Sequence, residues 1–411
     1  MKNLDHLLQR AAYFTSLVLV GSIPGFSMPL ENSVLGSVNR LIGGLALLLW
    51  LLSVVVTGRL GKLHLFHLLA TAFGLWYVVS LWWSVAPNET PFTASLIEGV
   101  ILSVMLWDIY RTQERLEAAM QAFLVGGCLS VVMTALNFAQ GQQVRHWEKR
   151  FAASGFDPND IALLLAIGIP MATYLATRRS SLTAFRVVNL LYPAAAALGI
   201  VLSGSRGALL AAAPAYLFFL IRMARLSRGW GFAMLGVLTA AVTGATRLDL
   251  SAPLQRLGTV TASSGDDHLS GRADIWRAGW AAFGEHPFLG VGGGAFSAAT
   301  MGKNGQGEAL IAHNTYLSVL TELGPIGFLL FLGLLALVLQ SALRQAPPMR
   351  EMSLLSLLVW AIGVFALSWE FRSQTWLLFG LIVAAGHCAP LACSAPLPLG
   401  RTESWGQRVG P

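Results

Sequence analysis

IGGLALLLWLLSVVV, residues Ile42–Val56, and PIGFLLFLGLLALVL, residues Pro325–Leu339, are two of the long apolar blocks that decide the fold of this 411-residue chain. Neither block contains a charged side chain, and neither has the recurring polar face of a helix in a soluble protein. Only 11% of all residues are charged, against about 25% in a typical soluble domain. Too little polar surface remains to cover a water-soluble particle. The sequence therefore predicts an all-α integral membrane protein and excludes a soluble globular enzyme.

At about 20 residues per crossing, the apolar blocks predict about twelve transmembrane helices. They are expected near residues 11–29, 39–57, 64–83, 93–110, 117–138, 160–177, 186–203, 206–222, 229–246, 312–340, 352–369 and 373–389. The chain then divides into spans 1–9 over residues 1–246, a large, partly helical loop with an interfacial helix over 247–311, spans 10–12 over 312–389, and a tail over 390–411.

The formal net charge of +7 is placed mainly in short connections between these spans. The arginines and lysines concerned are Arg59 and Lys62, Arg111 and Arg115, Arg178, Arg179 and Arg186, Arg222, Arg225 and Arg228, and Arg344 and Arg350. By the positive-inside rule, these connections and both termini are expected to face the cytoplasm. This distribution differs from the continuous basic surface of a nucleic-acid-binding protein. The three cysteines have no spacing typical of a disulfide framework or a zinc site.

The opposite, outer side of the predicted bundle holds a turn, Ser203–Leu209, that carries Arg206 between two apolar helices. An arginine at the membrane boundary is costly unless it reaches lipid headgroups or meets an anion. Glycines on both sides of the Ser205-Arg206 pair permit close backbone approach, and the start of the next helix favours negative charge. The turn is a candidate phosphate-binding site. The alternative is that Arg206 is a membrane anchor whose side chain snorkels to the lipid headgroups.

A second outer segment, Ser270–Trp280, is predicted to form a helix capped by Ser270. Arg272 and Trp276 lie four residues apart, as do Trp276 and Trp280, so the arginine shares a helix face with two indoles. We expect this helix to lie on the membrane surface and to direct Arg272 toward a lipid-linked ligand. An ordinary interfacial helix with solvated arginines is the alternative.

A third outer segment, Ala312–Leu317, contains His313 and leads directly into the tenth predicted span. A neutral imidazole at the outer mouth of the bundle can accept a proton from a sugar hydroxyl near neutral pH. His313 is therefore a candidate general base, although a histidine at a helix end is also a common structural residue.

Together these segments predict two guanidinium groups and an imidazole on one face, which suits an anionic leaving group beside a base. Guanidinium groups can neutralise a pyrophosphate without a metal ion, so neither a metal site nor a cofactor is predicted. Candidates for further substrate contacts are Arg145, Lys149, Arg150, Trp276, Asn314, Tyr316 and Glu322. A solvated loop patch is the alternative for the three basic residues, and structural pairing is the alternative for Glu322.

Four other features receive structural interpretations. The glycine run Gly290–Gly294 lacks a preceding strand and is predicted to be a flexible loop, not a nucleotide-binding loop. Phe156–Asp160 is typical of a capped helix start. Glu98, at membrane depth, is expected to have a structural partner. Glu370 is expected in the outer turn between the last two spans, paired with Arg372 or lining the rim of the site.

The same residues carry a resemblance to a known family. Ser205-Arg206-Gly207-Ala208-Leu209, the Gly271–Trp276 helix followed by His286–Gly292, and His313-Asn314 before Gly324-Pro325 are similar, in this order, to the signature of the O-antigen ligase and polymerase superfamily of bacterial envelope glycosyltransferases. The resemblance is specific from roughly residue 152 to residue 333. It implies a GT-C-type helical fold in the bacterial inner membrane, with a large periplasmic loop between spans 9 and 10 and an active site that opens to the periplasm.

The resemblance also implies residue roles. Arg206 and Arg272 would hold the pyrophosphate of an undecaprenyl-linked glycan, and His313 would activate the acceptor hydroxyl in an inverting, metal-independent transfer. The compact length and moderate loop are most similar to the ligase that joins O-antigen to lipid A-core in lipopolysaccharide biosynthesis. An O-antigen polymerase and a protein O-glycosyltransferase of the same superfamily are the alternatives. A membrane transporter is the non-enzymatic alternative, although no internal repeat of a fixed period is visible.

Overall fold

A computed structural model describes residues 2–26, 37–86, 91–144, 150–178, 183–226, 236, 239, 272–303 and 310–388. Regular structure in these ranges is helical, and no β-strand occurs there. The helices are α1 (Lys2–Gly25), α2 (Val38–Thr57), α3 (Leu65–Ser80), the 3-10 helix η1 (Leu81–Trp83), α4 (Pro91–Ile109), α5 (Gln113–Ala139), α6 (Pro158–Ala176), α7 (Thr183–Ser203), α8 (Arg206–Leu226), α11 (Arg272–Glu285), α12 (Phe296–Thr300), α13 (Thr315–Leu343), α14 (Pro347–Gly363) and α15 (Ser373–His387).

Eight of the described helices are long and apolar enough to cross a membrane: α2, α3 with η1, α4 to α8, and α13. The prediction of a helical membrane protein is confirmed at this level. The predicted spans at 11–29, 352–369 and 373–389 overlap α1, α14 and α15, and α14 and α15 have 17 and 15 residues. The predicted span 229–246 lies outside the continuously described residues.

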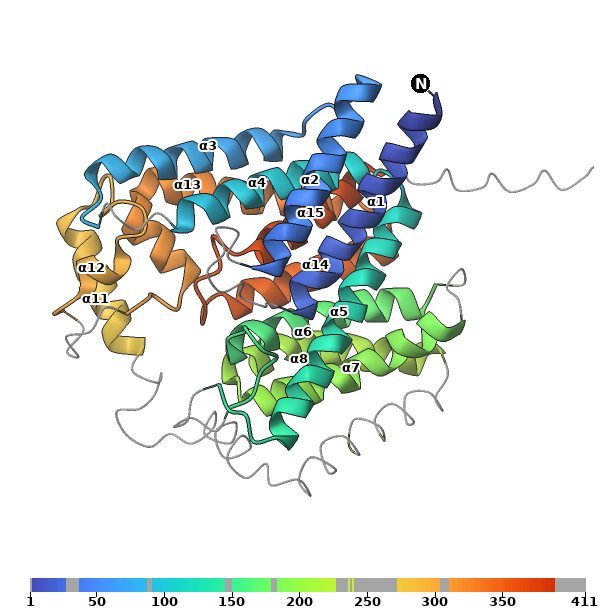
Figure 1. Cartoon of the computed structure of the whole chain (residues 1–411). Helices are drawn as coiled ribbons and strands as arrows, with labels where there is room; N and C mark the ends of the chain where they lie inside the picture. Colours follow the sequence, from blue (N-terminus) through green and yellow to red (C-terminus); the bar gives the residue numbers. More distant parts are fainter. Residues whose placement is uncertain are drawn as a thin grey trace, which may run out of the picture.

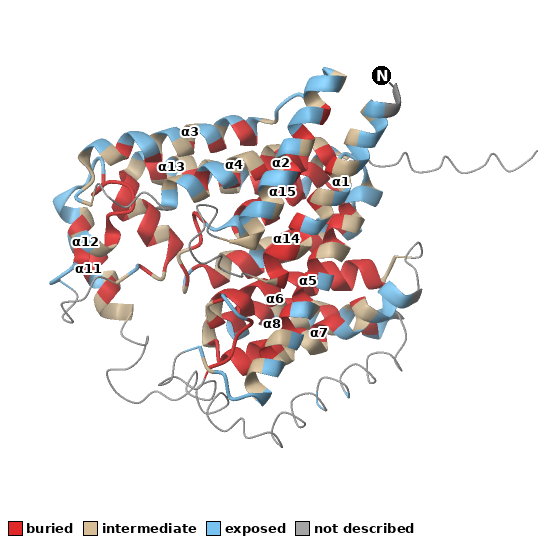
Figure 2. Cartoon of the chain, in the orientation of Figure 1, coloured by how far each residue is buried: buried red, intermediate tan, exposed pale blue. Residues whose placement is uncertain are grey.

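The helices pack into one bundle around α6 and α15 (Figure 1). α6 contacts α7, α8 and α14, α15 contacts α4 and α13, and α5 connects the pair α1 and α2 to α6 and α7. All side chains of α6 except that of Asn159 are buried, whereas α2 and α3 keep broad exposed faces (Figure 2). An apolar helix with no polar face belongs inside a bundle. α6 is therefore a core helix, and the exposed apolar faces of outer helices such as α2 suit contact with lipid.

The start of α6 has the predicted cap. The Asp157 carboxylate accepts a hydrogen bond from the backbone N–H of Asn159 at 2.8 Å, and Pro158 occupies the first turn, where a missing N–H costs nothing. The cap fixes where α6 begins and therefore where Asn159 points. The expected structural role of Phe156–Asp160 agrees with this geometry.

The connection between α14 and α15 is longer than predicted. The predicted span 352–369 was expected to reach the outer turn, but α14 ends at Gly363, and residues 364–372 form an irregular connection. The Thr315 backbone N–H donates to the Val364 carbonyl at 3.0 Å, and the Thr315 hydroxyl donates to the Leu367 carbonyl at 2.9 Å. Because these bonds to the start of α13 satisfy backbone groups, the chain can leave the helix early.

Helix α13 is broken at Gly324, whose φ of 64° and ψ of −172° lie outside the helical region. Pro325 follows and has no N–H for an intrahelical bond. Three carbonyl groups at the break instead accept hydrogen bonds from other segments. Val291 N–H donates to Thr321 and Gly292 N–H to Glu322, both at 2.9 Å, and the indole of Trp76 donates to Leu323 at 3.0 Å.

The glycine run Gly290–Gly294 is buried, so the prediction of a flexible loop is wrong. The Glu322 carboxylate accepts from the backbone N–H groups of Gly294 at 3.0 Å and Phe296 at 3.2 Å, and the Ser80 hydroxyl accepts from Gly293 at 2.9 Å. A Cβ on Gly290 would lie 2.4 Å from the Glu322 carbonyl oxygen. The glycines permit close backbone packing against the break in α13. They do not provide mobility.

We expect Gly324→Ala to destabilise the protein. Its φ and ψ lie in a region that is essentially restricted to glycine, and an added Cβ would meet the Phe288 carbonyl oxygen at 2.6 Å. A cost of about 1–3 kcal/mol should appear as a lower thermal unfolding midpoint of the purified protein in detergent. Gly44→Ala is the matched control, because a Cβ there meets nothing within 4 Å. Equal midpoints for the two variants would contradict the proposed constraint.

Candidate active site

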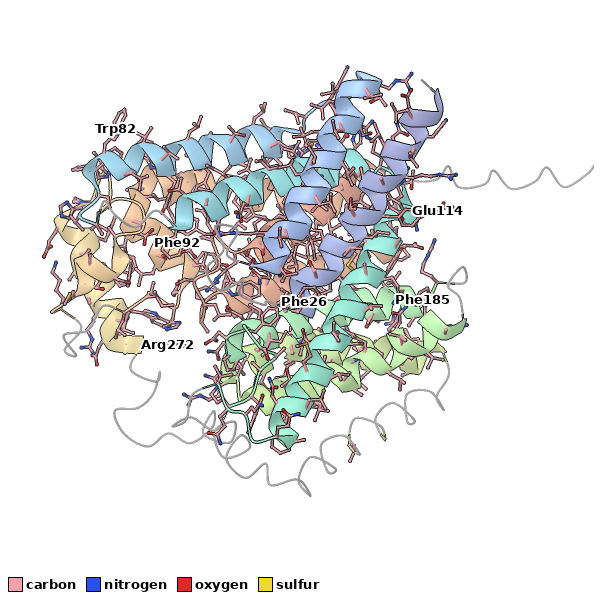
Figure 3. All side chains as sticks on the ribbon, viewed as in Figure 1. Phe26, Trp82, Phe92, Glu114, Phe185 and Arg272 are labelled. Carbon is pink, nitrogen blue, oxygen red and sulfur yellow. The ribbon has the colours of Figure 1, made fainter. Side chains whose placement is uncertain are left out.

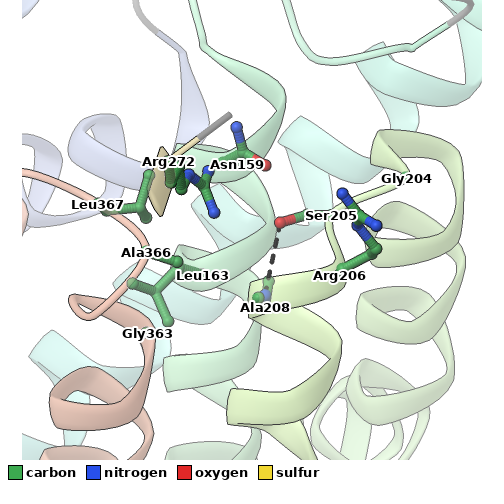
Figure 4. A pocket seen from close by; sticks show the side chains of 11 residues that line it. Asn159, Leu163, Gly204, Ser205, Arg206, Ala208, Arg272, Gly363, Ala366 and Leu367 are labelled. Carbon is green, nitrogen blue, oxygen red and sulfur yellow. Dashed lines mark hydrogen bonds between the residues drawn. The ribbon is translucent and has the colours of Figure 1, made fainter. Parts of the chain in front are cut away.

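A pocket of about 380 Å³ opens where α6, α8 and α11 begin and α14 ends (Figure 4). The residues that line it are Asn159, Leu163, Gly204, Ser205, Arg206, Gly207, Ala208, Arg272, Gly363, Ala366 and Leu367. Two of the three residues predicted to form the site, Arg206 and Arg272, therefore share one pocket although they are far apart in sequence. Among the residues that the structure describes, the lining contains both arginines and no acidic side chain.

Arg206 is held by a tight turn between α7 and α8. Gly204 has a φ of 60°, and its N–H donates to the Val201 carbonyl at 2.9 Å, which closes the end of α7. The Ser205 hydroxyl accepts from the N–H of Ala208 at 3.4 Å at the start of α8 (Figure 4). Arg206 is the first residue of α8, so its guanidinium lies where the helix dipole also favours an anion.

Arg150 supports the pocket from behind. Its side chain is 4% exposed, and it donates to the Ser203 carbonyl at the end of α7 at 2.8 Å and to the Asn159 side-chain oxygen at 2.6 Å. A cation at the C-terminus of α7 interacts favourably with the helix dipole. Arg150 was predicted as a possible substrate contact, whereas its burial places it next to the lining residue Asn159. The other two basic candidates, Arg145 and Lys149, lie outside the described residues.

Arg272 begins α11, and Trp276, one turn later, connects this helix to the segment before α13. The Trp276 indole donates to the Ala312 carbonyl at 3.0 Å, and the ring packs with Ile275, Phe296 and Leu317. Trp276 was predicted to lie on the membrane surface with Trp280. Only Trp280 has the exposure that this role requires, at 57%. The indole of Trp276 fixes α11 against the chain next to His313.

His313 is the only non-glycine residue with a positive φ, 46°, in the part of the chain that the structure describes. Such backbone conformations are uncommon and occur often at functional sites. His313 does not belong to the described lining of the pocket. Thr315, two residues later, donates its N–H and its hydroxyl to Val364 and Leu367, and Leu367 lines the pocket. His313 therefore lies on the segment that borders the pocket wall.

The other three predicted contacts on α13 have structural partners. The Asn314 side chain accepts from the N–H of Leu317 at 3.1 Å and caps the helix, and the Tyr316 hydroxyl donates to the Ala361 carbonyl at 3.3 Å. Glu322 is 5% exposed and binds the glycine run. Outside this region, Glu98 forms an ion pair with Arg40 at 3.1 Å, in agreement with the expected structural pairing.

Sequence reasoning missed the wall formed by residues 363–367 and the packing of the connection that follows it. Asp160 accepts from the Trp369 indole at 2.8 Å and lies 3.8 Å from the Arg372 guanidinium, which attaches the connection to the start of α6. Glu370 is buried. Burial raises the pKa of its carboxyl group, although hydroxyl groups such as that of Ser318 act in the opposite direction. α14 ends at Gly363, six residues before the end of the predicted span, and the hydropathy of the sequence does not indicate this end.

The pocket is suited to binding an anion. The positive ends of helix dipoles and two guanidinium groups act together there, and none of the described lining residues contributes a carboxylate. A diphosphate needs several donors around it, and the flanking Asn159 and Ser205 can add neutral ones. Within the described residues, no three His, Cys, Asp or Glu side chains gather as they would at a metal centre.

We expect Arg150→Met to destabilise the protein, because it removes two charge-assisted hydrogen bonds and leaves buried acceptors at Ser203 and Asn159. Each such bond contributes about 1.5–3 kcal/mol, so the thermal unfolding midpoint should fall by several degrees. Arg186→Met, on the exposed surface of α7, is the matched control and should leave the midpoint near that of the parent protein. A midpoint unchanged by Arg150→Met would show that Arg150 does not support the pocket.

A comparison with protein families finds a known family in the middle part of the chain. Residues 191–332 match the family model described as O-antigen ligase. The match runs from α7 into α13 and includes Arg206, Arg272 and His313. The comparison with curated proteins gives no match. The predicted resemblance is confirmed over residues 191–332, where this helical membrane protein matches the O-antigen ligase family model.

Proposed function

We propose that the protein is an O-antigen ligase, which transfers a glycan from undecaprenyl pyrophosphate to lipid A-core at the periplasmic face of the bacterial inner membrane. The observation that carries this proposal is the convergence on one pocket of Arg206 and Arg272, both of which belong to the matched residues 191–332. Both termini would lie in the cytoplasm, in keeping with the distribution of arginine and lysine between the spans.

The two arginines would bind the pyrophosphate of the donor. Guanidinium groups form paired hydrogen bonds to phosphate oxygens and stay charged at any physiological pH. The positive end of α8 adds to the same field. As the bond between the anomeric carbon and the phosphate oxygen breaks, negative charge grows on the leaving group. Arg206 and Arg272 would stabilise this charge, which lowers the barrier without a metal ion.

His313 would act as the general base. Its neutral imidazole accepts the proton of the acceptor hydroxyl while the hydroxyl oxygen forms a bond to the anomeric carbon. The electron pair of the breaking carbon–oxygen bond leaves with the pyrophosphate, and the imidazolium later releases its proton to water. Attack from the face opposite the leaving group inverts the anomeric centre. His313 lies two residues before Thr315, whose N–H and hydroxyl bind the connection that contributes Leu367 to the pocket, and this proximity in the chain supports this division of roles.

Lipid A-core is favoured as the acceptor because the chain is compact and its predicted outer loop, residues 247–311, is of moderate size. A second lipid-linked glycan would make the protein a polymerase, and a protein acceptor would make it an O-glycosyltransferase. A transporter would need charged or broken-helix sites near the bilayer midplane. α13 is broken at Gly324, but the carbonyl groups and the Glu322 carboxylate at this break bind the glycine run and Trp76. The pocket instead lies at the ends of α6, α7 and α8, which favours chemistry at a membrane surface.

An in vitro reaction can test the acceptor. The purified full-length protein would be supplied with one undecaprenyl-pyrophosphate glycan and, separately, with lipid A-core, a second lipid-linked glycan or a pilin-like peptide. We expect glycosylated lipid A-core as the product, with release of undecaprenyl pyrophosphate. If the second lipid-linked glycan instead gave a long polymer, the protein would be a polymerase and not a ligase. Uptake of glycan into vesicles without any new glycosidic bond would remove the enzyme proposal.

We expect Arg206→Ala and Arg272→Ala each to slow transfer by about 100- to 1000-fold and His313→Ala by at least about 100-fold. Membrane insertion should be unchanged. Matched controls are Arg277→Ala, which alters an exposed arginine of α11 paired with Asp274, and His6→Ala, at an exposed histidine of α1. Both controls should retain parental rates in a single-turnover assay. Parental activity of His313→Ala would remove the general-base role.

A further inference from the structure

A second polar pocket lies at the opposite end of the bundle. It is lined by Gln9, Ala12, Trp50, Ser53, Thr57, Arg59, Asp108, Ile109, Arg111 and Arg115, and its volume is about 710 Å³. A neighbouring open pocket, lined by Arg10, Tyr13, Phe14, Glu114 and Arg115, shares Arg115 with it. We call the two together the basic groove. Nothing in the proposed glycan transfer uses these residues.

The basic groove and the Arg206 pocket are separated by the length of a membrane-spanning helix. The groove lies where α5 begins, whereas the other end of α5 is joined to the pocket region through the Asn137 side chain, which donates to the Ala152 carbonyl. At about 1.5 Å per residue, the 27 residues of α5 extend over about 40 Å. Figure 3 shows Glu114 and Arg272 on opposite sides of the molecule. The groove is therefore on the side predicted to face the cytoplasm.

Positive charge exceeds negative charge in the basic groove. Four arginines line it, together with the carboxylates of Asp108 and Glu114. Asp108 is already engaged by the guanidinium of Arg111, the Trp50 indole at 2.9 Å and the Gly61 N–H at 2.9 Å. It has little capacity left to neutralise another cation.

The remaining arginines differ in their partners. Arg115 donates to the Ile109 carbonyl at 2.9 Å and stacks over the Tyr13 ring, with 5.1 Å between its guanidinium carbon and the ring centroid. Arg10 and Arg59 are exposed, and neither forms an ion pair with any residue that the structure describes. The groove thus offers two guanidinium groups to an anion from outside the protein.

Apolar side chains lie directly beside these cations. Phe14, 61% exposed, lines the groove. Leu7, which is also exposed, lies on α1 about one turn before Arg10. Val55 of α2 is also exposed. In a membrane protein such faces contact acyl chains. A ligand with a phosphate head and hydrocarbon tails matches this combination of an arginine-lined groove and an apolar wall.

We propose that the basic groove binds the phosphate headgroup of an anionic phospholipid of the cytoplasmic leaflet. Basic pockets between transmembrane helices on this side are known to suit such headgroups. A purely topogenic role requires positive charge near the helix ends, but it requires no pocket and no particular arrangement of the arginines. The convergence of residues from α1, α2 and the α4–α5 connection therefore favours a bound ligand.

The test measures the thermal unfolding midpoint of the full-length protein in a mild neutral detergent while phosphatidylglycerol, phosphatidylcholine or inorganic phosphate is added. Only phosphatidylglycerol should raise the midpoint of the parent protein. Arg10→Gln/Arg59→Gln should weaken its apparent affinity by about 25-fold, or about five-fold for each arginine removed. Arg10→Lys/Arg59→Lys should retain most of the affinity, which shows that the double glutamine variant has lost charge and not its fold.

Arg225→Gln/Arg350→Gln is the matched control. It removes two exposed arginines predicted to lie on the same side but outside the groove. Its affinity for phosphatidylglycerol should equal that of the parent protein. If the control lost as much affinity for phosphatidylglycerol as Arg10→Gln/Arg59→Gln, the effect would come from general surface charge, and the proposed site would be wrong. An equal rise with phosphatidylcholine or with inorganic phosphate would overturn the assignment to an anionic phospholipid.

Discussion

Backbone polar groups in apolar surroundings must find hydrogen-bond partners, and the break in α13 at Gly324 is where this constraint shapes the molecule. The carbonyl groups of Thr321, Glu322 and Leu323 accept from the glycine run and from Trp76. The Glu322 carboxylate binds the same run a second time. These bonds attach the segment after α11 to the middle of α13. Arg272 and His313, at the outer ends of these two helices, are positioned through them.

The Arg206 pocket combines two kinds of positive charge that depend on different parts of the sequence. Helix starts at Pro158 and Arg206 provide the positive ends of dipoles, and each start is fixed by a capping side chain, Asp157 or Ser205. Arg206 and Arg272 provide full charges. Arg150 is held behind the wall by α7 and Asn159, so it adds to the field without reaching the lining.

The sequence was sufficient to predict the helices and the proximity of Arg206 and Arg272, which line one pocket, while their role in binding a ligand stays a prediction. A long apolar block in a membrane must form a helix to satisfy its backbone hydrogen bonds. An arginine at a helix end in the membrane costs free energy unless it reaches headgroups or an anion, so few roles are open to it. The prediction of a flexible loop for the glycine run failed because both mobile loops and closely packed segments are rich in glycine. The hydrogen bonds from this run to Glu322 identify close packing, and they are not visible in the sequence. The 364–372 connection and the burial of Arg150 depend on contacts between distant segments. Local patterns carry no information about such contacts.

The bond from Trp276 to the Ala312 carbonyl has a consequence for motion. Together with the packing of Ile275 and Phe296 against Leu317, it joins α11 and the outer half of α13 into one rigid piece. Arg206 belongs to a different piece, the pair α7 and α8. Relative displacement of the two pieces would change the gap between the arginines while the spacing from Arg272 to His313 stayed constant. His313 and Arg272 would thus move as a unit, and the opening between Arg272 and Arg206 would be the dimension of the pocket that can vary.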